Sequence, residues 1–105
     1  MAPTRNSILV IDDEASVLSF LRLCLSRRGY RVDTAKSGEE GIKKIRANGY
    51  SMIITDIKMG SLSGDNVLYY LRDVLGDPTP VIGMSGTPGS LTIKNLTGSF
   101  INPVP

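Results

Sequence analysis

Apolar and polar positions follow one another in blocks that predict alternating strands and helices. Residues 7–11 and 52–55 are short apolar runs rich in β-branched side chains, which is typical of strands buried on both faces of a parallel sheet. Residues 30–34 alternate with a period of two, which predicts a half-exposed strand at a sheet edge. Residues 81–84 are a fourth candidate strand, and this strand leads into Ser85.

Helical spacing occupies the segments between these strands. Residues 14–28 carry one apolar stripe, made of Val17, Leu18, Leu21, Cys24 and Leu25. We expect Cys24 to be buried in that stripe and Gly29 to end the helix. Residues 37–40 have the spacing of a capping box and open a second helix, which residues 48–49 end. A third helix is expected to place five residues on one apolar side, namely Val67, Leu68, Leu71, Val74 and Leu75.

The last part of the chain has weaker patterns. Leu91, Ile93 and Leu96 fit a short helix, and residues 99–101 fit a fifth strand. The alternating order predicts a single α/β domain over residues 1–105, with a doubly wound parallel sheet of five strands. An α/β domain of this order is expected to end with a last helix, but the given sequence stops before it, so we predict the fold without that helix. One face of the sheet would then be covered by another molecule or by further chain, or the domain would be marginally stable.

Composition narrows the function. The chain has 105 residues, a net charge of +2 and no run of five like charges, which does not favour direct contact with nucleic acid. It has no histidine, so any metal site must use oxygen ligands, which excludes the usual zinc sites. It contains neither a long apolar segment nor a signal-peptide pattern, and we therefore expect a cytoplasmic protein without membrane contact.

Carboxylates follow two of the predicted buried strands. Asp12 and Asp13 come directly after the first strand, and Asp56 comes directly after the strand over 52–55. If these strands are neighbours, the three carboxylates converge in the crevice where open α/β sheets bind ligands. Such a cluster repels itself and favours a divalent cation such as Mg²⁺, Mn²⁺ or Ca²⁺, and one carboxylate could act as a nucleophile toward phosphorus. The alternative for Asp12 or Asp13 is a helix cap, but Asp56 favours the binding site.

These motifs together resemble the receiver domain of two-component response regulators. The resemblance rests on Ile-Leu-Val-Ile-Asp-Asp-Glu at residues 8–14, Asp-Ile-Lys-Met at 56–59, Gly64, and Ser-Gly at 85–86. It covers nearly the whole chain. It implies the flavodoxin-like fold with strand order 2-1-3-4-5, in which the first and third strands are neighbours at the switch point.

The resemblance also implies a role for each site residue. Asp56 would be the phosphoacceptor, and Asp12 and Asp13 would bind Mg²⁺ (or Mn²⁺) together with Asp56. The backbone carbonyl of Lys58 would be a further metal ligand, and Ser85 would supply the switch hydroxyl. The implied function is acceptance of a phosphoryl group from a sensor histidine kinase or phosphotransfer protein. Such a domain promotes its own phosphorylation but is not a conventional turnover enzyme.

Departures from the family pattern support a second hypothesis. Asn102 stands before Pro103, where the family usually carries a lysine, and Gly60 replaces the usual proline. The alternative is an atypical receiver that binds a protein partner independently of phosphorylation. Self-association or a fused output domain would cover the exposed sheet face. An aspartyl-phosphate phosphatase is not favoured, because Lys58 occupies the position where those enzymes need a second carboxylate.

Overall fold

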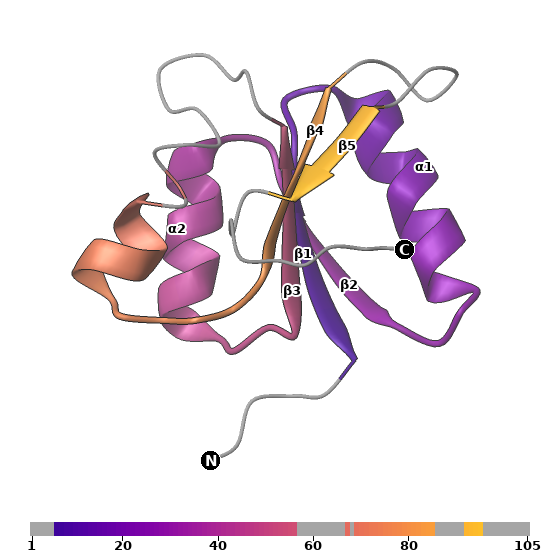
Figure 1. Cartoon of the computed structure of the whole chain (residues 1–105). Coiled ribbons are helices and arrows are strands. Elements are labelled where there is room, and N and C mark those ends of the chain that lie inside the picture. The colour runs from indigo at the N-terminus through magenta and orange to yellow at the C-terminus, as the bar shows by residue number, and fades with distance from the viewer. Residues whose placement is uncertain (1–5, 57–66, 68, 86–91, 96–105) are drawn as a thin grey trace.

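A five-stranded sheet is the centre of the computed structural model, which describes residues 6–56, 67, 69–85 and 92–95. The spatial order of the strands is β2-β1-β3-β4-β5. Their bounds are β1 Ser7–Ile11, β2 Arg31–Ala35, β3 Met52–Asp56, β4 Val81–Ser85 and β5 Thr92–Asn95. Strands β1 to β4 pair parallel to their neighbours, so the predicted doubly wound sheet and its order are confirmed (Figure 1).

The fifth strand differs from the prediction in both position and direction. β5 pairs antiparallel with β4, with Ile82 opposite Asn95, so the predicted short helix through Ile93 is wrong. A parallel connection needs a dozen or more residues, whereas only residues 86–91 separate β4 from β5. This short connection permits an antiparallel return only. Residues 99–101, the predicted fifth strand, lie outside the described residues, as does the end of the chain where a last helix was expected.

Two helices flank the sheet, and both end where the sequence predicts. α1 spans Ala15–Ser26, and Gly29 follows it with φ 92°, a left-handed conformation that glycine adopts without a Cβ penalty. α2 spans Gly38–Ala47 and has Asn48 as its C-cap. None of the helices that the structure describes is long and apolar enough to cross a membrane.

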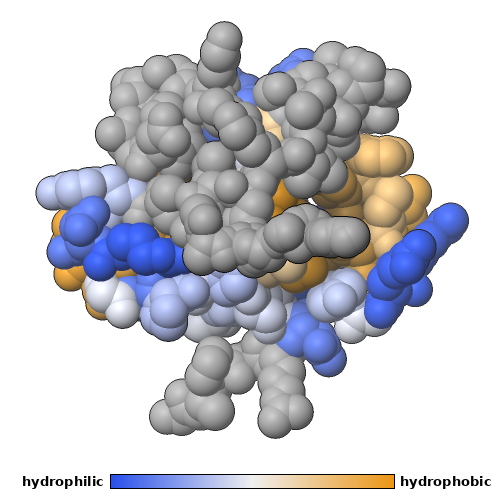
Figure 2. All heavy atoms as spheres, viewed as in Figure 1, coloured by the Kyte–Doolittle hydropathy of each residue, from blue (hydrophilic) through white to orange (hydrophobic). Residues whose placement is uncertain are grey.

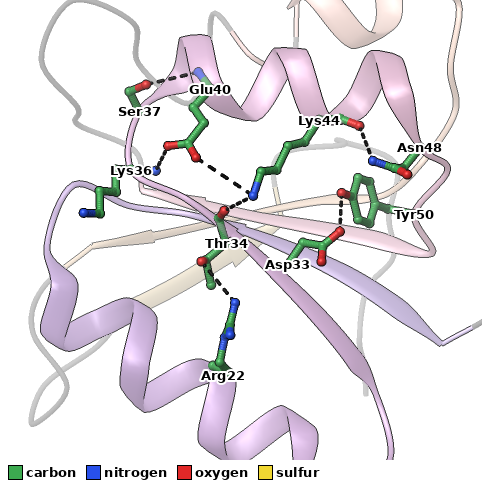
Figure 3. Close-up of polar contacts among 9 residues, drawn as sticks. All are labelled: Arg22, Asp33, Thr34, Lys36, Ser37, Glu40, Lys44, Asn48 and Tyr50. Carbon is green, nitrogen blue, oxygen red and sulfur yellow. Dashed lines mark hydrogen bonds and ion pairs between the residues drawn. The ribbon is translucent and has the colours of Figure 1, made fainter.

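The predicted capping box opens α2, with one change in its geometry. The Ser37 hydroxyl accepts a hydrogen bond from the Glu40 backbone N–H at 3.1 Å. The Glu40 carboxylate reaches past Ser37 and accepts from the Lys36 backbone N–H at 2.8 Å (Figure 3). These two bonds satisfy backbone donors that the first turn of a helix leaves unpaired.

Ser37→Ala is expected to lower the free energy of unfolding by about 1 kcal/mol, because the Glu40 N–H then has no cap. Urea unfolding followed by circular dichroism measures the change. Ser16→Ala is the matched control, since Ser16 is exposed within α1 and makes no described hydrogen bond. A Ser37→Ala protein as stable as the Ser16→Ala protein would contradict this role of the cap.

The core consists of two apolar clusters, one on each face of the sheet. All five residues of β1 are buried, as predicted for a central strand. Leu9 and Ile11 belong to one cluster with Ile45 of α2 and Ile53 of β3. Ile8 and Val10 belong to the other, with Val17 of α1. Figure 1 shows α1 on one side of the sheet and α2 on the other. The sheet is therefore the middle layer of three.

A π-helix, η1, replaces most of the third predicted helix. η1 spans Tyr70–Val74, and the Leu75 N–H donates to the Tyr70 carbonyl at 3.0 Å, the i→i+5 pairing of a π-turn. The wider turn moves the later residues away from the core. Leu71 is fully buried, but Val74 is 56% exposed and Leu75 is 40% exposed, so the prediction for these two residues is wrong.

The outer side of α1 is more apolar than predicted. Cys24 is exposed, contrary to the expectation, because it lies at the margin of the buried stripe beside Phe20 and Leu23. Figure 2 shows hydrophobic residues at the surface on this side of the molecule. α1 is the one described helix on this face of the sheet, and Met52 and Ile54 of β3 are only partly buried there.

Candidate functional site

Two neighbouring strands bring three carboxylates together at one end of the sheet. β1 is followed directly by Asp12 and Asp13, and β3 ends with Asp56. Ile11 pairs with Thr55, so Asp12 and Asp56, the next residue on each chain, lie at the same end of two adjacent strands. The three residues each offer one carboxylate oxygen, and these oxygens all lie within 4.8 Å of one another. The structure thus produces the convergence that the two apolar runs indicated.

The three carboxylates differ in their surroundings. Asp12 is 2% exposed, Asp56 is half-buried and Asp13 is exposed. The backbone N–H of Asp12 donates to the Ala35 carbonyl of β2 at 3.0 Å, which holds Asp12 in line with the sheet. Its Oδ1 accepts from the Glu14 backbone N–H at 2.8 Å. Asp12 therefore has a fixed side chain, while Asp13 faces solvent.

The helix-cap alternative does not describe either aspartate. The N-cap of α1 is Glu14, and its side chain makes no capping hydrogen bond. The bond from Glu14 N–H to Asp12 closes an Asx turn before the helix begins. The turn positions the carboxylate of Asp12 at the strand end.

Burial and neighbouring charge together shift the titration of Asp12. The pKa of Asp12 is raised from 3.8 to about 6, chiefly by loss of hydration and to a lesser degree by the nearby charges of Asp56, Asp13 and Glu14. The hydrogen bond from the Glu14 N–H opposes the shift, because it favours the ionised form. Burial and mutual repulsion therefore disfavour the fully ionised cluster, and a bound cation would relieve that repulsion.

The raised pKa of Asp12 makes the stability of the metal-free protein depend on pH. The folded protein holds the Asp12 proton more tightly than the unfolded chain does, so this contribution to stability is lost as pH rises between about 4 and 6. Urea unfolding in a chelator across this range measures it. Asp12→Asn is expected to remove that part of the pH dependence, and equal pH profiles for the two proteins would contradict the assignment.

The donor set fits a hard divalent cation. Asp12, Asp13 and Asp56 offer carboxylate oxygens only, within a span that one ion can bridge directly or through water. Mg²⁺ typically takes one or two carboxylates and keeps several waters, and the exposure of Asp13 leaves room for them. The residues present therefore fit the metal that the sequence suggested.

The other predicted site residues are only partly described. Ser85 is the last residue of β4, one position beyond the pair formed by Asp56 and Met84, so its backbone lies at the same end of the sheet as the cluster. Lys58 and Asn102 lie outside the described residues.

Two positioning contacts near the cluster were not predicted from the sequence. Thr55 is fully buried, and its hydroxyl donates to the backbone carbonyl of Asp56 at 3.2 Å. The Asx turn at Asp12 is the second contact. An aspartate two residues before a helix N-cap is able to form such a turn, whereas a threonine within an apolar run gives no sign of its partner.

The family comparison matches most of the chain. The model of the response regulator receiver domain matches residues 8–97. Transcriptional regulatory protein DltR of Streptococcus agalactiae serotype III (strain NEM316) is 35% identical over 95 residues, covering 90% of this chain and 39% of DltR. Alkaline phosphatase synthesis transcriptional regulatory protein PhoP of Bacillus subtilis (strain 168) is 42% identical over 65 residues, which is 62% of this chain and 27% of PhoP. The chain thus spans about a third of the length of such curated relatives.

Solved structures agree with this comparison. The N-terminal domain of a response regulator receiver protein from Methanoculleus marisnigri JR1 superposes with a TM-score of 0.72 at 31% identity, over 78% of this chain and 68% of that one. Response regulator protein TrrA from Thermotoga maritima, in complex with Mg(2+)-BeF, has a TM-score of 0.67 at 36% identity, over 71% of this chain and 64% of TrrA. Both matches support the parallel order β2-β1-β3-β4 described above.

Proposed function

Because the chain belongs to the response regulator receiver domain family, we propose that it accepts a phosphoryl group on Asp56 in a Mg²⁺-dependent reaction. The observation that carries the proposal is the approach of the Asp12, Asp13 and Asp56 carboxylates to within 4.8 Å of one another. The similarity to TrrA, whose structure contains Mg(2+)-BeF, supports the choice of metal.

The three carboxylates divide two tasks in this proposal, attack on phosphorus and binding of the metal. An oxygen of Asp56 attacks phosphorus while the bond from phosphorus to the donor nitrogen breaks, which forms an acyl phosphate on Asp56. Asp12 and Asp13 bind Mg²⁺ together with Asp56, and their different exposure gives one fixed ligand and one beside solvent. When bound, Mg²⁺ neutralises negative charge on the transferring group.

Three further residues are assigned by resemblance. The Lys58 backbone carbonyl would complete the metal ligands, and the Ser85 hydroxyl would donate to a phosphoryl oxygen. Asn102 stands where the family usually has lysine, and its amide would donate a neutral hydrogen bond about half as strong as a charged one. We therefore expect the phosphorylated form to be held less tightly than in a receiver with the lysine.

Incubation with phosphoramidate and Mg²⁺ followed by intact-protein mass spectrometry tests the proposal. We expect one phosphoryl adduct on the wild-type chain and none when a chelator replaces Mg²⁺. Asp56→Asn is expected to abolish the adduct. Asp73→Asn is the control, because Asp73 is an exposed aspartate of η1 outside the cluster. No adduct on the wild type, or an adduct that survives Asp56→Asn, would contradict the assignment.

The proposed context is two-component signal transduction in the cytoplasm. Residues 1–105 would act as one receiver-like domain that takes its phosphoryl group from a sensor histidine kinase or a phosphotransfer protein. The domain would promote its own phosphorylation without being a turnover enzyme. The curated relatives are named as transcriptional regulatory proteins, so a fused output part or a second copy would read the phosphorylated state. We do not expect this domain itself to contact nucleic acid.

The alternative function is protein binding that does not depend on phosphorylation. Asn102 in place of the usual lysine is the sequence feature that favours it. Partner binding that is unchanged by Asp56→Asn and by Mg²⁺ would support this alternative. Binding that changes with both would favour the phosphoacceptor.

A further inference from the structure

A hollow lies on the opposite margin of α1 from Phe20, where the helix meets the edge strand β2. Its volume is about 280 Å³, and six residues line it, namely Ala15, Leu18, Ser19, Arg22, Thr34 and Lys36. None of them belongs to the carboxylate cluster. The volume lies just below the range of drug-sized ligand pockets, so a small ligand fits it best.

The lining has two cations and no carboxylate. Arg22 and Lys36 provide the positive charge, and the hydroxyls of Ser19 and Thr34 add hydrogen-bond donors. Within the described part of the chain, neither Arg22 nor Lys36 forms an ion pair with a carboxylate. The lining is therefore complementary to an anion.

The donors of Arg22 are held toward the hollow. Its Nη2 donates to the Thr34 hydroxyl at 3.3 Å, which fixes the guanidinium against β2 (Figure 3). A guanidinium has five N–H donors, so this bond leaves others for a ligand. The Thr34 oxygen accepts that bond, and its own hydrogen can then point to an acceptor.

Neighbouring contacts keep Lys36 available. The carboxylate of Glu40 accepts a hydrogen bond from the Lys36 backbone N–H at 2.8 Å, and does not pair with the Lys36 ammonium. Glu40 pairs instead with the Lys44 ammonium at 3.9 Å, and that ammonium donates to the Thr34 carbonyl at 2.7 Å. Figure 3 shows the Lys36 amine pointing away from Glu40. The positive charge of Lys36 is therefore not neutralised by the network beneath it.

We propose that this hollow binds a small phosphate monoester. A phosphate monoester is a dianion at neutral pH with three acceptor oxygens, which matches the Arg22 fork, the Lys36 ammonium and the two hydroxyls. The side chains of Ala15 and Leu18 provide an apolar floor for the organic part of the ester. The hollow shares no residue with the carboxylate cluster, and its occupancy does not require the proposed phosphoacceptor function.

Titration of the whole chain with glycerol 3-phosphate, followed by ¹⁵N-resolved NMR, tests the proposal. The experiment uses Asp56→Asn protein in a chelator, so that no phosphoryl transfer contributes. We expect saturable shifts at the amides of Ser19, Thr34 and Lys36. Inorganic phosphate is expected to bind more weakly because it does not contact the apolar floor. Equal affinity for both probes would overturn the ester assignment.

Substitutions at the hollow give the matched comparison. Arg22→Gln is expected to weaken binding about tenfold or more, because it removes a charged, forked donor. Arg22→Lys keeps the charge but not the fork, and should weaken binding less. Arg27→Gln is the control, since it makes the same charge change on an exposed residue just after α1, outside the hollow. Shifts that never saturate, or equal weakening by Arg27→Gln, would overturn the proposal.

Discussion

At pH 7, Asp12→Asn is expected to be more stable than the wild type without metal and less stable than the wild type with Mg²⁺ in excess. In a chelator the variant should be more stable than wild type by roughly 1–2 kcal/mol, because it no longer carries a buried charge beside two other carboxylates. The amide oxygen of the variant can still accept the Glu14 N–H bond. With Mg²⁺ in large excess, the wild type should be the more stable protein.

The size of the metal effect decides which of the two proteins is more stable with Mg²⁺. Mg²⁺ at about 100 times its dissociation constant stabilises a binding protein by about 2.7 kcal/mol. If the loss of the Asp12 carboxylate weakens binding about 100-fold, the same concentration stabilises the variant by only about 0.4 kcal/mol. Thermal unfolding at several Mg²⁺ concentrations measures both terms.

Asp73→Asn provides the control for the metal experiment. Asp73 is exposed on η1 and is no part of the described cluster, so its substitution should leave both the chelator and the Mg²⁺ curves unchanged. Parallel curves for wild type and Asp12→Asn would mean that Asp12 is not a metal ligand. The proposed site would then have to be rejected.

Leu71→Ala is expected to lower the free energy of unfolding by about 2–5 kcal/mol. Leu71 is fully buried under the α2 side of the sheet, and its removal leaves a cavity there. A domain has only about 5–15 kcal/mol of stability in total, so the variant should unfold at much lower urea concentration.

Val74→Ala is the matched comparison, because both residues belong to η1. Val74 is 56% exposed, and its truncation should change stability by less than about 0.5 kcal/mol. A regular α-helix with the predicted apolar side would make both truncations costly. Similar losses for the two variants would therefore contradict the π-turn.

Patterns among residues close together in the sequence were sufficient to predict the sheet and the carboxylate cluster. Residues 8–11 and 52–54 are apolar without interruption, as is typical of the central strands of a parallel sheet, and they lie in the adjacent strands β1 and β3. Because parallel strands end at the same edge of the sheet, Asp12, Asp13 and Asp56 had to converge once those strands were neighbours.

Features that depend on tertiary contacts were not predictable in the same way. The i→i+5 bond from Leu75 to Tyr70 has no counterpart in apolar spacing, so Val74 was placed on the wrong side. Cys24 was expected to be buried because of its position in the apolar stripe, but it is exposed, since the stripe does not indicate which other elements cover it. The direction of β5 follows from the length of its connection to β4, a constraint that the local pattern around Ile93 does not contain.

The central claim is that Asp56 carries the phosphoryl group. Acyl phosphates are reduced by borohydride, which converts a phosphorylated aspartate to homoserine. After reaction with phosphoramidate and Mg²⁺, followed by borohydride and peptide mass spectrometry, we expect homoserine at position 56 and unmodified aspartate at positions 12 and 13. Homoserine at position 12 or 13, or a phosphorylated chain in which residue 56 remains aspartate, would contradict the account.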